Sequence, residues 1–246
     1  MIYLGGGGSE HDESRVWDAA FHPGQRIVVW PQAQPAHRWA GTLSWVHTAL
    51  TARGSSPNAV TLGTEALGPD HGLATADALV IPGGNTFTLL AHLRRHDLLP
   101  RVRAFLSRGG VVYGGSAGAV IMGRDVGVVE GPAEEGLDEN REGMGRDLLD
   151  ALDALGGCVV FPHYDGGARW ERHCGSWARE RGVTVLGIPE RGGLVVDVDV
   201  DEREGGGWAE SVGPEEVRIF GRDGSVRVWP DGVRMGLREL GAGGGT

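Results

Sequence analysis

Short runs of apolar, largely β-branched residues alternate with longer amphipathic stretches along most of this 246-residue chain. The alternation is typical of a parallel β-sheet covered by helices on both faces, because each strand needs a crossover helix before the next parallel strand begins. We predict strands over residues 2–4, 26–30, 59–62, 78–81, 111–113, 158–161 and 183–188. We predict helices over residues 36–52, 86–95, 98–107, 144–155 and 170–181.

The pattern changes beyond residue 187, where three apolar runs follow one another closely. We predict strands over 194–198, 216–220 and 225–229, joined by Gly- and Asp-rich turns, as an antiparallel C-terminal edge. The sequence therefore predicts a single α/β domain over 1–240 with a mostly parallel sheet. Residues 201–207 are predicted to be an exposed loop and 241–246 a flexible tail.

Composition excludes several classes of function. The formal charge of −10 argues against a nucleic-acid partner, since phosphate binding needs a basic face. The two cysteines, Cys158 and Cys174, do not have the spacing of metal ligands. The chain contains no apolar run near the ~20 residues of a membrane span and no leader segment, so we expect a cytoplasmic protein that acts on small molecules or peptides.

A glycine-flanked serine follows the predicted strand at 111–113. Ser116 lies between Gly114 and Gly118, and a helix-compatible segment follows it. This is the pattern of a nucleophile elbow, in which small neighbours permit the sharp strand-to-helix turn that exposes the serine hydroxyl. The same residues would also suit a tight turn in which the serine caps the helix.

A nucleophilic serine needs an imidazole base, and the imidazole needs an acceptor that fixes its tautomer. His163 directly follows the predicted strand at 158–161, so we expect it at the same sheet edge as Ser116. Glu190, after the strand at 183–188, is the preferred orienting acid, and Asp125 and Asp138 are alternatives. Because the chain has no lysine, a lysine base is excluded.

A second turn at a strand end supplies backbone groups for the same site. The sequence Pro-Gly-Gly-Asn at 82–85 follows the predicted strand at 78–81. We expect the N–H groups of Gly84 and Ala117 to form an oxyanion hole, since glycine permits close approach of a substrate to the backbone. Asn85 is predicted to cap the following helix and to contact substrate.

Four ordered segments resemble the peptidase E family of aspartyl dipeptidases, in the class I glutamine-amidotransferase-like superfamily. They are IPGGNTFTLL at 81–90, GSAGA at 115–119, FPHY at 161–164 and LGIPE at 186–190. The resemblance implies a flavodoxin-like three-layer fold and a triad of Ser116, His163 and Glu190. It also implies hydrolysis of dipeptides with an N-terminal aspartate, no metal or organic cofactor, and a homodimer.

Aspartate specificity requires a cation for the substrate side chain. Arg169 and, second, Arg172 lie just past His163 and resemble the arginine-bearing segment of the family. The segment between Ser116 and His163 is longer and more acidic than in the aspartyl dipeptidases, and the loop after His163 is shorter. Because both segments flank the expected substrate cleft, the resemblance does not fix the identity of the substrate. The alternatives are a cyanophycinase-like hydrolase of β-aspartyl-arginine units and a non-catalytic binding protein. An amidotransferase is disfavoured, because it would need cysteine at position 116.

Overall fold

Among the described residues, five adjacent parallel strands make up one end of the larger of two sheets. The computed structural model describes residues 1–54, 60–130, 149–198 and 207–242. The parallel strands are adjacent in the order β3-β2-β4-β5-β1, which confirms the predicted parallel sheet. Their bounds are β1 (Ile2–Gly5), β2 (Ile27–Val29), β3 (Val60–Leu62), β4 (Ala78–Ile81) and β5 (Val111–Gly115).

The larger sheet continues past β1 with antiparallel strands. Its eight strands follow the order β12-β9-β8-β1-β5-β4-β2-β3. The added strands are β8 (Gly193–Asp197), β9 (Trp208–Val212) and β12 (Arg234–Gly236). The predicted antiparallel edge is confirmed, although two of its strands, β9 and β12, were not predicted.

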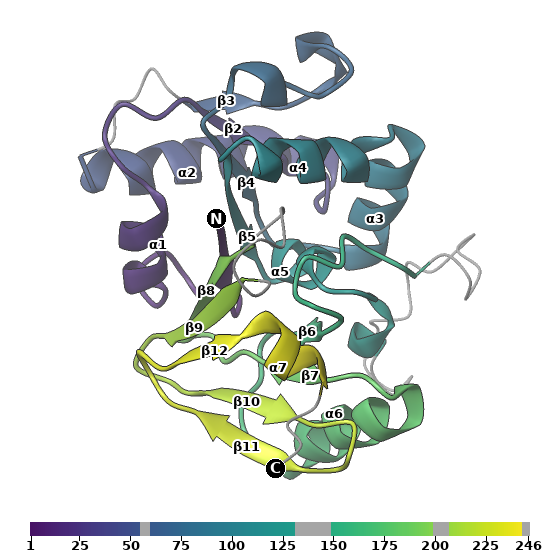
Figure 1. Cartoon of the computed structure of the whole chain (residues 1–246). Coiled ribbons are helices and arrows are strands. Elements are labelled where there is room, and N and C mark those ends of the chain that lie inside the picture. Colours follow the sequence, from purple (N-terminus) through teal and green to yellow (C-terminus); the bar gives the residue numbers. More distant parts are fainter. Residues whose placement is uncertain (55–59, 131–148, 199–206, 243–246) are drawn as a thin grey trace.

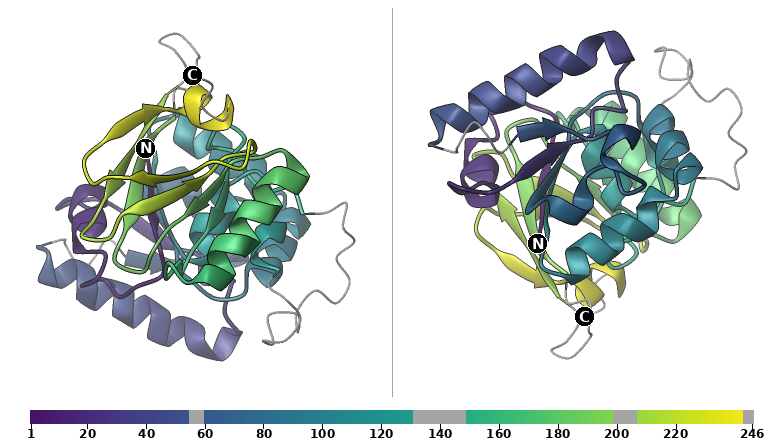
Figure 2. Two further views of the ribbon diagram at one scale, coloured as in Figure 1. Left: turned by 90° about the horizontal axis from the view of Figure 1, so that it is seen from below. Right: turned by 90° about the horizontal axis from the view of Figure 1, so that it is seen from above.

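Helices cover both faces of this sheet. Tyr3 packs with Trp17 of α1 (Ser14–Ala20) in one buried cluster, whereas Ile2 and Leu4 belong to another on the opposite face. This division follows from the alternation of side chains along a strand. Figure 2 shows α2 lying along one side of the molecule. The remaining helices beside the sheet are α2 (Trp39–Ala52), α3 (Thr86–Arg95), α4 (Leu98–Ser107) and α5 (Ala117–Met122).

A second, four-stranded sheet contains four strands that we predicted for the main sheet, including the two predicted edge strands at 216–220 and 225–229. Its order is β11-β10-β7-β6, and α6 (Ala168–Arg181) packs against it (Figure 1). The prediction of a single sheet was wrong, because an apolar run indicates a buried strand but not which neighbour it pairs with. The strands are β6 (Val159–Phe161), β7 (Val185–Gly187), β10 (Val217–Phe220) and β11 (Val226–Trp229).

The predicted helix at 144–155 is wrong over its described part, residues 149–155, which contain no helix. Leu149, Leu152 and Leu155 are buried at a helix-like spacing. The segment instead packs against the end of α5, where the N–H of Leu152 donates a hydrogen bond to the carbonyl oxygen of Ile121 at 2.9 Å. The unpaired carbonyls of that helix end thus gain partners from an irregular segment.

The C-terminal prediction also needs correction. A short helix, α7 (Leu237–Ala242), extends into the predicted tail at 241–246, and residues 243–246 lie outside the described part of the chain. Most of the predicted loop at 201–207 lies outside it as well. Among the described residues, no helix has the length and apolar character that crossing a bilayer would require.

Candidate active site

Ser116 occupies the sharp turn between β5 and α5 with a backbone that few residues adopt. Its φ and ψ are 49° and −109°, a strained conformation that costs about 1–3 kcal/mol. The flanking glycines are required by packing: a Cβ on Gly118 would lie 2.0 Å from the carbonyl oxygen of Ile81, and one on Gly114 2.5 Å from the carbonyl oxygen of Gly118. The predicted sharp turn is therefore confirmed, with the serine at its apex.

The three residues proposed from strand ends lie in one hydrogen-bonded chain. Ser116 Oγ is 2.9 Å from His163 Nε2, and His163 Nδ1 is 2.9 Å from Glu190 Oε1. A neutral imidazole in this position donates from Nδ1 to the carboxylate and accepts the serine proton at Nε2. The His163 and Glu190 side chains are 48% and 60% exposed, so a small substrate and water can reach them.

The two sheets contribute different members of this hydrogen-bonded series of three side chains. Ser116 follows β5 of the larger sheet, while His163 and Glu190 follow β6 and β7 of the smaller one. The expectation that His163 lies on the same sheet edge as Ser116 was therefore wrong. The juxtaposition depends on how the ends of the two sheets are joined.

The loop after β1 makes that join. Gly5 accepts a hydrogen bond from the Ser116 N–H at 3.2 Å, and Gly6 accepts one from the His163 N–H at 2.8 Å. A Cβ on Gly6 would lie 1.9 Å from the carbonyl oxygen of Pro189, the residue before Glu190. A run of glycines is thus needed where the segments bearing all three side chains converge.

Gly7 is the member of this loop nearest the imidazole. Its φ is +105°, in the region that favours glycine. A Cβ added there would lie 2.2 Å from His163 Cε1 and 2.5 Å from Nε2. The bare backbone of Gly7 therefore leaves the space that the ring occupies.

A buried carboxylate that sequence reasoning missed holds the loop in place. Glu13 Oε1 accepts hydrogen bonds from the N–H groups of Gly7 and Gly8 at 2.8 and 3.0 Å, and its Oε2 accepts one from the Tyr113 hydroxyl. Burial raises the pKa of Glu13 to about 7 despite these bonds, and burial raises the pKa of Tyr113 well above its usual value. Only its position five residues after Gly8 could have suggested this contact, and that is a weak signal.

The alternative acids are placed differently. Asp125 Oδ1 accepts a hydrogen bond from the N–H of Gly127 in its own turn. The backbone of Asp125 forms an isolated antiparallel β-bridge with that of Asp150. Asp138 lies outside the described residues. Of the two candidate acids that the structure describes, Glu190 and Asp125, Glu190 is the one that forms a hydrogen bond with His163.

A pocket of about 320 Å³ opens beside Ser116 and His163. The predicted residues Gly84 and Asn85 line it, and Asn85 also caps α3 by accepting from the Thr88 N–H at 2.7 Å. Its apolar walls, which sequence reasoning missed, come from Phe87, Val129, Phe161 and Trp170.

The two predicted arginines differ in their relation to this pocket. The guanidinium of Arg169 stacks over the ring of Trp170, with its carbon 4.8 Å from the ring centroid. Arg172 is exposed on α6. Neither arginine is among the described residues that line the pocket, but Arg169 contacts Trp170, which does line it.

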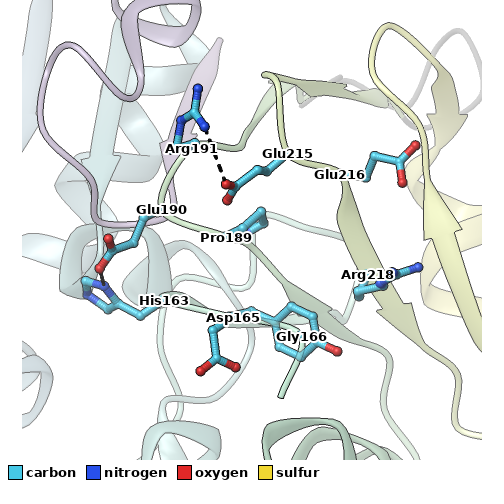
Figure 3. A pocket seen from close by; sticks show the side chains of 10 residues that line it. His163, Asp165, Gly166, Pro189, Glu190, Arg191, Glu215, Glu216 and Arg218 are labelled. Atoms are coloured by element: carbon cyan, nitrogen blue, oxygen red, sulfur yellow. Dashed lines mark hydrogen bonds and ion pairs between the residues drawn. The ribbon is translucent and has the colours of Figure 1, made fainter. Parts of the chain in front are cut away.

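A second cavity, of about 580 Å³, is also lined by His163, together with Glu190 (Figure 3). Its lining is highly charged, with Arg191 3.8 Å from Glu215 and with Glu216 and Arg218 farther along the wall. Figure 3 shows the Glu190 carboxylate turned toward His163 and away from Glu215. His163 thus lines both an apolar pocket and a charged cavity.

Known proteins resemble this chain in sequence and in fold. The model of peptidase family S51 matches residues 1–200. A pyridoxal 5'-phosphate synthase subunit PdxT from Listeria monocytogenes is 40% identical over 78 residues, which are 30% of this chain and 40% of that protein. A peptidase E from Actinobacillus pleuropneumoniae is 45% identical over 51 residues, 21% of this chain and 22% of its own.

These two matches span less than half the length of the curated relatives. The crystal structure of a peptidase from an acI-B1 Actinobacterium aligns over 96% of both chains with a TM-score of 0.66 and 17% identity, a likeness of fold. The family match covers most of the chain and includes the segments that carry Ser116, His163 and Glu190. The chain therefore belongs to peptidase family S51.

Proposed function

We propose that Ser116, His163 and Glu190 form the catalytic triad of this peptidase. The observation that carries the proposal is the pair of consecutive 2.9 Å contacts from Ser116 Oγ to His163 and from His163 to Glu190. A serine hydroxyl is a poor nucleophile unless a base removes its proton as it attacks. The geometry supplies that base and an acid that fixes its orientation.

The reaction proceeds in two halves. Ser116 Oγ attacks the peptide carbonyl carbon while His163 Nε2 takes the hydroxyl proton, and the same imidazole then returns the proton to the leaving amine as the C–N bond breaks. In the second half, water attacks the acyl ester, again with His163 as base, and releases Ser116. Glu190 stays ionised throughout and stabilises the imidazolium that forms in each half.

Backbone N–H groups at two helix starts stabilise the oxyanion. Ala117 is the first residue of α5, so its N–H has no partner within the helix. Gly84 lines the pocket beside Ser116. Its φ is +145°, and a Cβ added to it would lie 2.4 Å from the carbonyl oxygen of Ala33, so this position excludes any side chain. We assign these two N–H groups to the oxyanion hole.

The substrate is a dipeptide with an N-terminal aspartate. The pocket of about 320 Å³ lies at the small end of ligand sites, which suits two residues better than a polymer. Arg169, held against Trp170 in the pocket wall, supplies a guanidinium for the aspartate side chain. The similarity of one segment to a peptidase E supports the same assignment.

A β-aspartyl-arginine hydrolase is the second candidate. The charged cavity next to the His163–Glu190 pair carries Glu215 and Glu216, which could bind arginine side chains of such a substrate. Glu215 already faces Arg191 at 3.8 Å, so part of this acidic surface is neutralised within the protein. The dipeptide assignment therefore has the better support.

Initial rates on matched substrates test these assignments. The protein is assayed with Asp-Leu, Asn-Leu, Ala-Leu, Glu-Leu and β-Asp-Arg, with release of the N-terminal residue as the readout. Asn-Leu has nearly the shape of Asp-Leu without its charge, so an Asp-Leu preference of roughly tenfold or more reports a charge-assisted contact. Equal rates on these two substrates contradict the aspartate assignment, and cleavage of β-Asp-Arg alone transfers it to the second candidate.

A further inference from the structure

Three histidines and a glutamate gather at the C-terminal end of α3, the helix labelled in Figure 1. Glu65 belongs to the 3-10 turn η3 (Glu65–Leu67), His71 lies in the following loop, and His92 and His96 lie in the last turn and at the C-cap of α3. Asn85 caps the opposite end of the same helix in the Ser116 pocket. At 1.5 Å per residue, His92 and His96 lie about 10 and 16 Å along the helix from Asn85.

The imidazoles in this cluster lack the hydrogen bonds that buried histidines usually make. His71 is 1% exposed, and its Nδ1 has no hydrogen-bond partner among the described residues. The buried Nε2 of His92 also has none among them. Leaving such a nitrogen unpaired costs about 1–3 kcal/mol.

The arrangement of potential ligand atoms suits one cation. One atom from each of Glu65, His71 and His96 lies within 4.8 Å of the other two. His96 Nε2 and Glu65 Oε1 are 3.3 Å apart, close to the separation of about 3.3 Å that two ligands have in a tetrahedral zinc site with bonds of ~2.0–2.1 Å. Glu65 has a side chain that is 71% exposed, so it can adjust to close the remaining distance.

The rings themselves are mutually packed. The centroid of His71 lies 5.2 Å from that of His96 and 5.4 Å from that of His92, and the latter two centroids are 4.4 Å apart. Imidazoles crowded in this way, at the electronegative C-terminal end of a helix, favour a cation among them. Asp70 adds a nearby negative charge, whereas Arg101 adds a positive one that a bound cation must offset.

We propose that Glu65, His71 and His96 bind a divalent transition-metal ion of the zinc type, with His92 packed beside the ligands. Two imidazoles and one carboxylate are a donor set that zinc accepts, and water completes a tetrahedral shell. The ion ties the loop after β3 to the end of α3. Its role is structural, since the site lies at the far end of α3 from the residues that line the Ser116 pocket.

Direct metal titration tests the site independently of any peptidase activity. The full chain, freed of affinity tags and treated with a chelator, is titrated with Zn²⁺ by calorimetry, and with Co²⁺ for the visible bands of tetrahedral coordination. We expect one ion per chain and a rise in melting temperature with metal. His96→Gln removes a ligand and should weaken metal binding by more than about 100-fold. Even replacing a residue that only hydrogen-bonds to a metal ligand lowers metal affinity by about 10- to 100-fold.

Matched variants identify where the ion binds. Glu65→Gln changes an exposed side chain and cannot be dismissed as unfolding, so it should weaken binding too. His37→Gln, on an exposed histidine, and His163→Ala, in the catalytic site, should bind as the wild type does. The proposal fails if no saturable binding of one ion occurs, if Glu65→Gln and His96→Gln both bind normally, or if His163→Ala abolishes binding.

Discussion

Replacing Gly7 with alanine tests whether the loop after β1 positions the imidazole. The new Cβ would lie 2.2 Å from His163 Cε1, whereas carbon atoms in contact lie about 3.5–4.0 Å apart, so the ring must move by more than about 1 Å. That movement breaks the 2.9 Å contacts of His163 with Ser116 and Glu190. A misplacement of 1 Å can cost about 100-fold in rate, so we expect kcat/KM to fall by at least roughly that factor.

Gly24 provides a matched control for the backbone cost. Its φ of +84° also disfavours alanine, but no heavy atom lies within 4 Å of the added Cβ. We expect both Gly7→Ala and Gly24→Ala to lose about 1–2 kcal/mol of stability in denaturant titrations. Only Gly7→Ala should lose activity on Asp-Leu. Equal activity in the two variants would refute the positioning role of this loop.

Three further predictions concern charged groups. Glu190→Gln should reduce kcat by about 100-fold or more while Asp125→Asn stays near the wild-type rate, and the reverse order would assign the acid to Asp125. Because Glu13 has a pKa of about 7 in the native state against 4.5 in the unfolded chain, its ionisation opposes folding, and stability falls as pH rises between these values. Denaturant titrations should show wild type losing roughly 3 kcal/mol relative to Glu13→Gln between pH 4.5 and about 8, and parallel curves would contradict the raised pKa. Arg169→Ala should lower kcat/KM for Asp-Leu by roughly 10- to 100-fold without affecting Ala-Leu, whereas Arg172→Ala should change neither, and equal effects of the two variants would contradict the assignment.

The sequence predicted the parallel sheet because strands buried on both faces leave continuous apolar runs. Residues 78–81 and 111–113 are such runs, and the structure pairs β4 and β5 there in parallel. The strand-end rule also selected Ser116, His163 and Glu190 as candidates, and each of them follows a strand. Local sequence was sufficient to select these residues, but it did not predict that two separate sheets bring them together.

Other features depend on contacts between distant segments and could not be predicted in this way. β6 and β7 have the same apolar pattern as the main-sheet strands, yet β7 pairs with β10, more than 30 residues away. Glu13 reaches Tyr113 across 100 residues. Leu149, Leu152 and Leu155 are buried at a spacing that is typical of a helix, but the spacing of apolar residues indicates only which side chains are buried and not the backbone conformation.

The central claim is that Ser116 and His163 act as one unit, and a double-mutant cycle on Asp-Leu hydrolysis tests it most directly. Turnover is measured for the wild type, Ser116→Ala, His163→Ala and the double variant, with folding verified by circular dichroism. We predict that each single change lowers kcat by at least about 10⁴-fold and that the double variant is no worse than either. A Ser116→Ala protein within tenfold of wild type, or losses that multiply in the double variant, would contradict the proposed mechanism.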